Sequence, residues 1–261
     1  MPSRSLMVSR RIPLLVTTLI PGRNPPSLGI LTSSVCRAIV KIGSSKGLVV
    51  EGTVPGSSRR ALEDVFGVLE REVLTETLGV RVRAEVEGGC VSSLGIAAVL
   101  SLLVIEALEG YYEEEFSKDE KTGVLASLLV EARLLPKPAA SCLAHTLVFG
   151  KPTLYSEADG PIHVEAPPVN CVVEKEMELG SPEESPPCLL DALAKLSSVL
   201  VVEITTSVSR GEQPPNSVTK AFNSIWHILY DAPPQPGGRI IVPDLYGKAL
   251  VVLLGERGEE P

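Results

Sequence analysis

Residues 87–100 constrain the fold of this chain most strongly, because they join a strand-like run to a long apolar helix through a very short turn. Gly88 and Gly89 make the turn, and Ser92 and Ser93 stand where the helix is expected to begin. A helix that starts after a glycine turn presents free backbone N–H groups to an anion. The same residues also suit a serine-capped buried helix, and the local pattern alone favours that simpler interpretation.

The composition predicts a globular chain with a large core. Of its 261 residues, 44% are hydrophobic and 21% are charged, which suffices for one large domain or for two lobes of one fold. The net charge of −8 leaves no basic footprint of the kind that nucleic-acid binding requires. A small anionic ligand would therefore depend on loop N–H groups and a few cationic side chains.

The cysteines and histidines do not form a recognisable motif. An odd number of cysteines, widely spaced and without a C-x-x-C pair, indicates neither a disulfide framework nor a zinc site, so a reducing compartment is expected. With three histidines, no paired-histidine metal site is visible. The residues concerned are Cys36, Cys90, Cys142, Cys171, Cys188, His145, His163 and His227.

A soluble, cytoplasmic protein is expected. The basic N-terminus followed by an apolar run resembles a signal peptide, but residues 21–26 are rich in proline and lack the small-x-small cleavage pattern. The most apolar helix, Ile96–Leu108, is too short to span a bilayer and carries Glu106. Scarce Asn and Gln and 22 prolines fit a thermophile.

The order of elements predicts an α+β fold of two lobes, with mixed sheets packed against helices. The boundary is expected at 150/151, giving lobes 1–150 and 151–261, with a frayed tail after residue 254. Strands are predicted at Ile12–Ile20, Val35–Ile42, Gly47–Val54, Val80–Val86, Thr153–Tyr155, His163–Glu165, Asn170–Leu179, Arg239–Val242 and Ala249–Leu254, the second and third pairing around residues 43–45. Helices are predicted at Arg59–Leu78, Leu94–Glu109, Gly123–Leu135, Ala139–Phe149, Leu189–Thr206 and Val218–Tyr230.

This order of parts resembles the GHMP kinase superfamily, which includes galactokinase, homoserine kinase and mevalonate kinase. Its members carry a G-L-G-S-S-A-A phosphate loop that enters a helix. Here the loop is Gly89-Cys90-Val91-Ser92-Ser93-Leu94-Gly95, which keeps the first Gly and both Ser but has Val91 for the second Gly. The resemblance implies a nucleotide-phosphate site at Gly88, Gly89, Ser92 and Ser93, with ATP and Mg²⁺ as cofactors.

Within the superfamily, the chain looks most like the archaeal pantoate kinases, which also have Ser-Leu-Gly before the second strand, as in Ser27-Leu28-Gly29. The resemblance implies an ATP-dependent kinase for pantoate or a similar hydroxy-acid, serving coenzyme A biosynthesis. Arg23 and Ser27 become candidate substrate-binding residues. Glu131 stands where a magnesium ligand is expected, and Cys142 falls where the catalytic Asp should be.

Two functions therefore remain open. A neutral thiol at Cys142 is a poor general base, yet phosphoryl transfer depends chiefly on positioning and charge, so a kinase is retained. Glu131 equally suits a solvated helix surface, and Cys142 a buried small side chain. The alternative is a catalytically degenerate descendant that keeps the fold for binding or assembly. The expected partner is a small molecule, not nucleic acid or membrane, with a homodimer left open.

Overall fold

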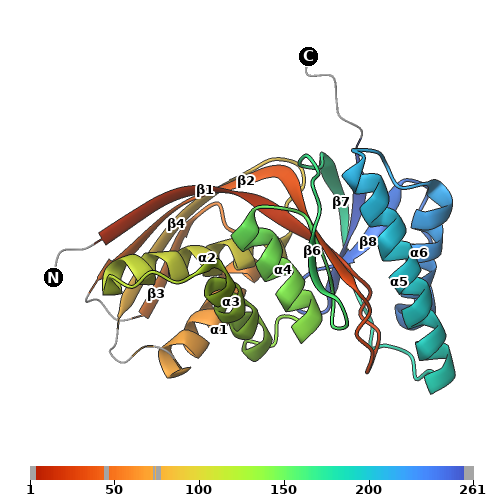
Figure 1. The fold of residues 1–261 in the computed structure, drawn as a ribbon, viewed down its shortest axis with the longest axis horizontal. Coiled ribbons are helices and arrows are strands. Elements are labelled where there is room, and N and C mark those ends of the chain that lie inside the picture. The colour runs from red at the N-terminus through yellow and green to blue at the C-terminus, as the bar shows by residue number, and fades with distance from the viewer. Residues whose placement is uncertain (1–3, 44–46, 73, 75–77, 256–261) are drawn as a thin grey trace, which may run out of the picture.

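The computed structural model describes residues 4–43, 47–72, 74 and 78–255. In that part of the chain a curved sheet arches over four helices, and a smaller sheet with two helices lies at the opposite end from the N-terminus (Figure 1). Two buried hydrophobic clusters correspond to these parts. One fills the space beneath the curved sheet, and the other lies between the smaller sheet and its helices.

The larger sheet is built on one long central strand, β2 (Ser27–Gly43). β1 (Arg4–Val16) pairs antiparallel with β2 along its length, and the other edge of β2 is shared by β4 and β5. The order is β3-β4-β2-β5-β6, with β1 off this path. The remaining strands are β3 (Gly47–Gly52), β4 (Gly79–Glu87), β5 (Thr153–Ser156) and β6 (Gly160–His163).

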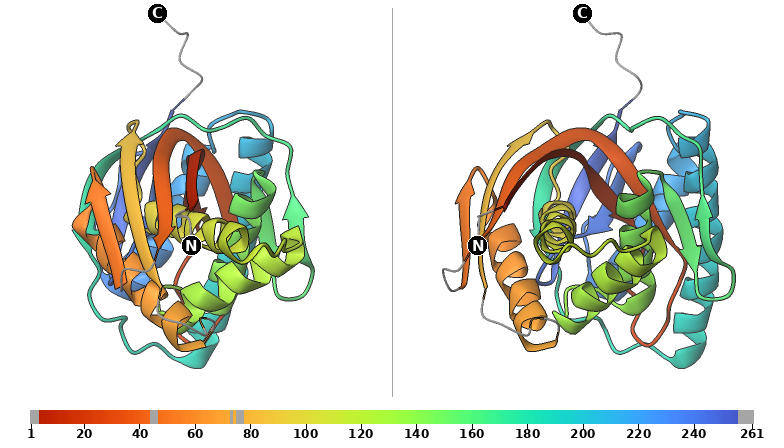
Figure 2. Two further views of the ribbon diagram at one scale, coloured as in Figure 1. Left: turned by 90° about the vertical axis from the view of Figure 1, so that its left-hand side faces the viewer. Right: turned by 60° about the vertical axis from the view of Figure 1, so that its left-hand side comes forward.

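Four helices cover one face of this sheet, as the two side views show (Figure 2). Along β4 and the second half of β2, buried and solvent-facing residues alternate, as expected for a sheet with one covered face. The helices are α1 (Gly56–Glu72), α2 (Ser93–Tyr112), α3 (Lys118–Glu131) and α4 (Lys137–Phe149).

Helix α2 is the central element of the larger core. With 20 residues it is longer than the predicted apolar helix Ile96–Leu108, so the expectation that it is too short to cross a membrane is wrong. However, 89% of its most apolar window is buried inside the fold. It packs against β1, β2 and the three other helices of this lobe. Its burial on nearly all sides explains why its sequence is apolar around the whole helix and not along one stripe.

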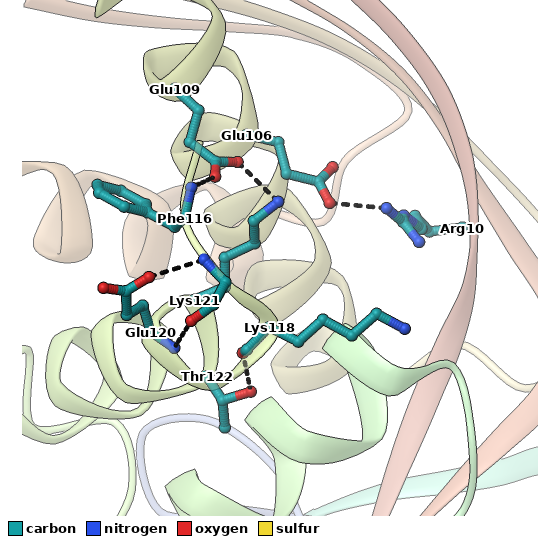
Figure 3. A network of polar contacts seen from close by, with 9 residues as sticks. Arg10, Glu106, Glu109, Phe116, Lys118, Glu120, Lys121 and Thr122 are labelled. Atoms are coloured by element: carbon teal, nitrogen blue, oxygen red, sulfur yellow. Dashed lines mark hydrogen bonds and ion pairs between the residues drawn. The ribbon is translucent and has the colours of Figure 1, made fainter. Parts of the chain in front are cut away.

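The charged side chains of α2 are paired at its C-terminal half (Figure 3). Arg10 on β1 donates to Glu106 at 2.7 Å. Glu109 forms an ion pair with Lys121 of α3 at 2.9 Å and accepts the backbone N–H of Phe116 at 2.7 Å. These contacts join α2 to the sheet on one side and to the start of α3 on the other.

The smaller sheet has the order β7-β9-β8 and is entirely antiparallel. Trp226 and Phe222, its largest buried side chains, pack from the last helix against it. The elements of this lobe are β7 (Cys171–Glu178), α5 (Pro187–Ser209), α6 (Asn216–Tyr230), β8 (Arg239–Pro243) and β9 (Lys248–Leu254).

Several expectations need correction. The first strand begins at Arg4, before the predicted Ile12, because β1 follows β2 through a bulge between Arg11 and Pro13. The predicted pairing of the second and third strands is wrong: β4 lies between β2 and β3 and pairs with both. Thus β3, α1 and β4 form a parallel crossover. Three predictions fall largely outside the described residues: the turn at residues 44–46, the last turn of the first predicted helix, and the frayed tail.

The boundary at 150/151 stays a prediction, but β5 and β6 hydrogen-bond to the larger sheet, mainly through β2. Leu245, near the end of the chain, belongs to the core of the larger lobe. Leu14 and Ile30, near its beginning, belong to the other core. The two lobes are therefore interwoven in sequence.

Gly95 allows α2 to lie close against β1. A Cβ atom there would lie 2.2 Å from the carbonyl oxygen of Pro13 and 2.9 Å from Ile12. We expect Gly95→Ala to lower the free energy of unfolding by about 1–3 kcal/mol, because backbone has to move. Gly123→Ala, in open space on α3, should instead raise it by roughly 0.5–1 kcal/mol. Urea unfolding distinguishes these outcomes, and equal effects would contradict the close approach.

Candidate functional site: the start of helix α2

The start of α2 follows the expected serine-capped geometry. Ser92 is the N-cap residue, in extended conformation, and its hydroxyl accepts the N–H of Gly95 at 3.1 Å. The N–H of Ile96 makes the first intrahelical bond, to the carbonyl of Ser92. The N–H groups of Ser93 and Leu94 thus remain for a ligand outside the helix, as the predicted phosphate site requires.

These two N–H groups bind a carboxylate from the protein itself. Asp244, in the turn between β8 and β9, accepts the N–H of Leu94 at 2.6 Å and that of Ser93 at 3.2 Å. The hydroxyl of Ser92 donates to the same carboxylate at 3.4 Å. Asp244 is only 8% exposed. A negatively charged group at a helix N-terminus is favoured by the helix dipole, and here it takes the position that a phosphate would need.

The turn that carries Asp244 is anchored on the larger lobe. Leu245 inserts into the core beneath the curved sheet. Tyr246 has a positive φ of 55° and donates its hydroxyl to Asp64 of α1 at 2.8 Å. The guanidinium of Arg60 lies 4.8 Å from the centre of the Tyr246 ring. These contacts fix the two residues directly after Asp244, so its carboxylate is a built part of the site.

The loop before α2 is packed against other segments. Gly88 has a φ of 118°, and a Cβ atom there would meet Ser34 at 2.3 Å. The hydroxyl of Ser34 also accepts the N–H of Cys90 at 2.9 Å. The carbonyl of Gly89 accepts the N–H of Val173 on β7 at 3.0 Å. Gly88 is therefore needed for a close approach within the protein, and Gly89 faces the smaller sheet.

Cys90 and Cys171 form a disulfide that ties this loop to the start of β7, with a Cα–Cα distance of 5.1 Å. This corrects the expectation that no disulfide is present. Spacing could not reveal the bond, because the two cysteines are 81 residues apart and meet only when the two lobes pack. Cys36, Cys142 and Cys188 are free thiols.

The predicted magnesium ligand, Glu131, is an exposed residue at the end of α3. Among the described residues, no three His, Cys, Asp or Glu side chains gather into a group that could hold a metal ion. The helix start that should bind nucleotide phosphates is occupied by Asp244. These residues do not fit Mg-ATP as the resemblance implies, and we derive no step through it.

Cys142, expected at the position of the catalytic base, is fully buried in α4. Its thiol donates to the carbonyls of Ser27 and Thr153, each at 3.2 Å. Burial raises its pKa far above the ordinary thiol value, despite opposing hydrogen bonds. These surroundings argue against Cys142 as a base, because a thiolate would be strongly disfavoured there.

The two predicted substrate residues do line a pocket, of about 430 Å³. Arg23 forms an ion pair with Asp191 of α5 at 2.5 Å. Ser27 is buried and donates its hydroxyl to Thr17 at 3.0 Å. The pocket is lined by residues 17–25, Ser27, Pro136, Pro138, Ala139, Pro182 and Tyr230, none of them in the 88–93 loop.

Residues that join the lobes were missing from the expectations. Tyr230 of α6 donates to the carbonyl of Leu19 at 2.5 Å, and Thr18 hydrogen-bonds Ser197 of α5 at 2.7 Å. The sequence indicates only that Asp244 lies in a turn, because Pro243-Asp244-Leu245-Tyr246-Gly247 stands between two apolar runs. Nothing local indicates that this turn meets a helix start 150 residues earlier.

The titration of Asp244 should be visible in the stability of the protein. Burial raises the pKa of its carboxyl, against the hydrogen bonds from Leu94 and Ser93 that lower it. The folded state therefore binds the proton more tightly than the unfolded state, whose pKa is about 3.9. We expect the unfolding free energy of wild type, relative to Asp244→Asn, to fall as pH rises from about 4 through the raised pKa. Parallel urea-derived profiles for the two proteins would contradict this.

The disulfide can be tested by counting thiols. Denatured without reductant, the purified protein should expose three reactive thiols, and with reductant all five cysteines. Cys171→Ser should lose about 4 kcal/mol of stability, since the bond closes a loop of about 80 residues. Cys188→Ser, at an exposed free thiol, is the control and should change little. Five reactive thiols before reduction would contradict the bond.

The fold has known counterparts among solved structures, while no family model and no curated protein matches the chain. Among solved structures, L. major mevalonate kinase in complex with R-mevalonate superposes with a TM-score of 0.61 at 12% identity, over 98% of this chain and 89% of that one. Methanococcus jannaschii mevalonate kinase gives 0.56 at 10% identity, over 96% and 90%.

A third similar structure is not a kinase by name. Mevalonate diphosphate decarboxylase from Legionella pneumophila gives a TM-score of 0.55 at 8% identity, over 97% of this chain and 94% of that one. At such low identities the likeness shows the fold alone. The predicted fold class is thereby confirmed: the chain has the two-lobed α+β fold of the GHMP-type kinases.

Proposed function

We propose that this chain is a non-catalytic small-molecule-binding protein built on the fold of the GHMP-type kinases. The observation that carries the proposal is the Asp244 carboxylate on the N–H groups of Ser93 and Leu94. A phosphate group and a carboxylate cannot share this helix start, because two anions at one site repel each other. Phosphoryl transfer depends on such positioning, so its loss removes most of the catalytic apparatus.

The binding part of the proposal rests on the pocket beside Arg23 and Ser27. Its volume of about 430 Å³ lies in the range usual for small-ligand pockets. Thr17, Thr18 and Ser27 are among its lining residues, but their hydroxyls are buried and hydrogen-bond within the protein. The partly exposed guanidinium of Arg23 is therefore the polar group that the pocket offers to a small molecule.

Arg23 would select an anionic ligand in this pocket. Its ion pair with Asp191 is partly exposed, and such pairs contribute only about 0–1 kcal/mol. A ligand carboxylate could therefore displace Asp191 at low cost. A small hydroxy-acid fits this description, and Arg23→Ala should abolish its binding without unfolding the protein.

The second candidate is an active ATP-dependent kinase for a hydroxy-acid such as pantoate, acting in coenzyme A biosynthesis. It is favoured by the same pocket, since Arg23 and Ser27 are the residues that the resemblance assigns to the substrate. It would require Asp244 to leave the start of α2 when the nucleotide binds. A coupled assay of ADP release with pantoate and Mg-ATP tests it directly.

We expect Mg-ATP to leave the melting temperature of wild type unchanged. A working site at about 100 times its dissociation constant would add roughly 2.7 kcal/mol of stability. Asp244→Ala exposes the free N–H groups, so inorganic sulfate should stabilise that variant more than wild type. The measurement is a thermal melt with and without sulfate, at matched ionic strength.

Asp64→Ala is the matched control, because it removes a carboxylate of α1 that accepts from Tyr246 and not from the N–H groups of Ser93 and Leu94. It should show no sulfate-dependent gain. Stabilisation of wild type by Mg-ATP, or ADP release with a hydroxy-acid, would refute the non-catalytic function and favour the kinase.

We also place the protein in the cytoplasm of a thermophilic archaeon. A buried disulfide is unusual for a cytoplasmic protein, but intracellular proteins of hyperthermophilic archaea are an exception. The scarcity of Asn and Gln supports the same origin.

A further inference from the structure

Helix α5 carries an apolar stripe on its outer surface. Leu189 is 37% exposed, Leu196 42%, Val199 60% and Val202 47%. The helix lies at the end of the molecule farthest from the N-terminus, outside the smaller sheet (Figure 1). Its buried residues, such as Leu193, Leu200 and Ile204, belong to the core of this lobe. The exposed stripe is thus additional to the apolar face that the fold needs.

The stripe follows the spacing of a helix-pairing face. Leu196, Val199 and Val202 recur every three residues, and Leu189 lies seven residues before Leu196. At 100° per residue these four side chains fall within a band of about 140° around the helix, with Val199 near its middle. The stripe therefore covers one side of the helix.

Two unpaired charges flank the centre of the stripe. Lys195 and Glu203 are exposed, and neither takes part in the ion pairs formed by the described side chains. They lie four residues before and four after Val199, about 40° to either side of it around the helix at 100° per residue. Their charges cancel, so the stripe itself is electrically neutral.

The stripe and its charges on one copy of the chain are complementary to the same stripe on a second, antiparallel copy. A two-fold axis at Val199, perpendicular to an antiparallel pair of α5 helices, brings residues equally far before and after Val199 to the same level. Lys195 of one copy then lies at the same level as Glu203 of the other, across the line of contact, and the pair occurs twice by symmetry. Leu196 meets Val202 in the same way, and Val199 meets its own copy.

The charges favour a second copy over a lipid surface. A helix that lies on an anionic membrane carries an excess of Lys and Arg beside its apolar face. Here the single Lys195 is balanced by Glu203, and Asp191 adds a further acid on the same helix. The whole chain has a net charge of −8, which opposes binding to anionic lipid.

We propose that the chain forms a two-fold symmetric homodimer through antiparallel pairing of α5, centred on Val199 and held in register by Lys195 and Glu203. The interface is small, because one helix of 23 residues supplies most of it. Small interfaces are typical of transient association, so we expect a reversible dimer with a dissociation constant on the order of micromolar.

Sedimentation velocity of the full chain over a concentration series tests the dimer. Val199→Glu should raise the dissociation constant by about 100-fold or more, because two carboxylates meet at the axis. Lys195→Glu and Glu203→Lys should each weaken the dimer by about tenfold, since each replaces two attractive pairs by repulsive ones. The double variant Lys195→Glu/Glu203→Lys should regain the wild-type constant.

Met7→Glu is the matched control, an exposed apolar residue on β1 at the other end of the molecule, and it should leave dimerisation unchanged. Circular dichroism confirms that each variant is folded. A wild type that stays monomeric up to about 500 µM would overturn the proposal. So would a Val199→Glu protein that still dimerises, or a double variant no tighter than the single ones. Co-sedimentation of the wild-type monomer with anionic vesicles would assign the stripe to lipid instead.

Discussion

The carboxylate of Asp244 on the first N–H groups of α2 is the interaction on which the rest of this structure depends. It joins a turn of the smaller lobe to the central helix of the larger one. The helix dipole and two N–H donors stabilise the charge, while burial disfavours it and raises the pKa of the carboxyl. Removing the carboxylate leaves buried N–H groups without partners, which typically costs about 1–3 kcal/mol each. The interaction therefore persists because its loss would leave these buried N–H groups without hydrogen-bond partners.

A helix start of this kind is an anion-binding site when an external ligand supplies the anion, and a structural cap when a side chain of the protein does. The same glycine turn, serine pair and helix start would serve a nucleotide phosphate if the space in front of them were open. In this chain Leu245 and Tyr246 hold a carboxylate there, and the disulfide at Cys90 keeps the preceding loop against β7. The helix start thus still binds an anion, but a carboxylate of the protein takes the place of an external phosphate. At the pocket beside Arg23 the protein's own carboxylate, Asp191, is held only by a partly exposed ion pair, which is why binding is the function we retain.

Local patterns predicted most elements, because burial imposes its period on the sequence. The helices were found from apolar spacing, and Ser92 was found from capping chemistry. The order of strands in the sheet was not: β4 separates β2 from β3, and only the tertiary pairing decides this. The role of Asp244 and the Cys90–Cys171 bond could not be predicted either, because in both cases the partners are distant in the chain and meet only in the tertiary structure. The family resemblance assigned Arg23 and Ser27 to one substrate site, and both line the same pocket. It could not show that the loop at Gly89 packs against β7.

The bond between Cys90 and Cys171 also has a topological consequence. It closes a covalent ring that contains α2, α3, α4, β5 and β6, so most of the larger lobe's helices lie inside one loop of chain. The exposed turn at residues 157–159 belongs to this ring. A protease that cuts there opens the ring without releasing a fragment, because the two pieces remain joined through sulfur. Asp244 lies outside the ring, so the carboxylate at the start of α2 comes from a segment that the ring does not contain.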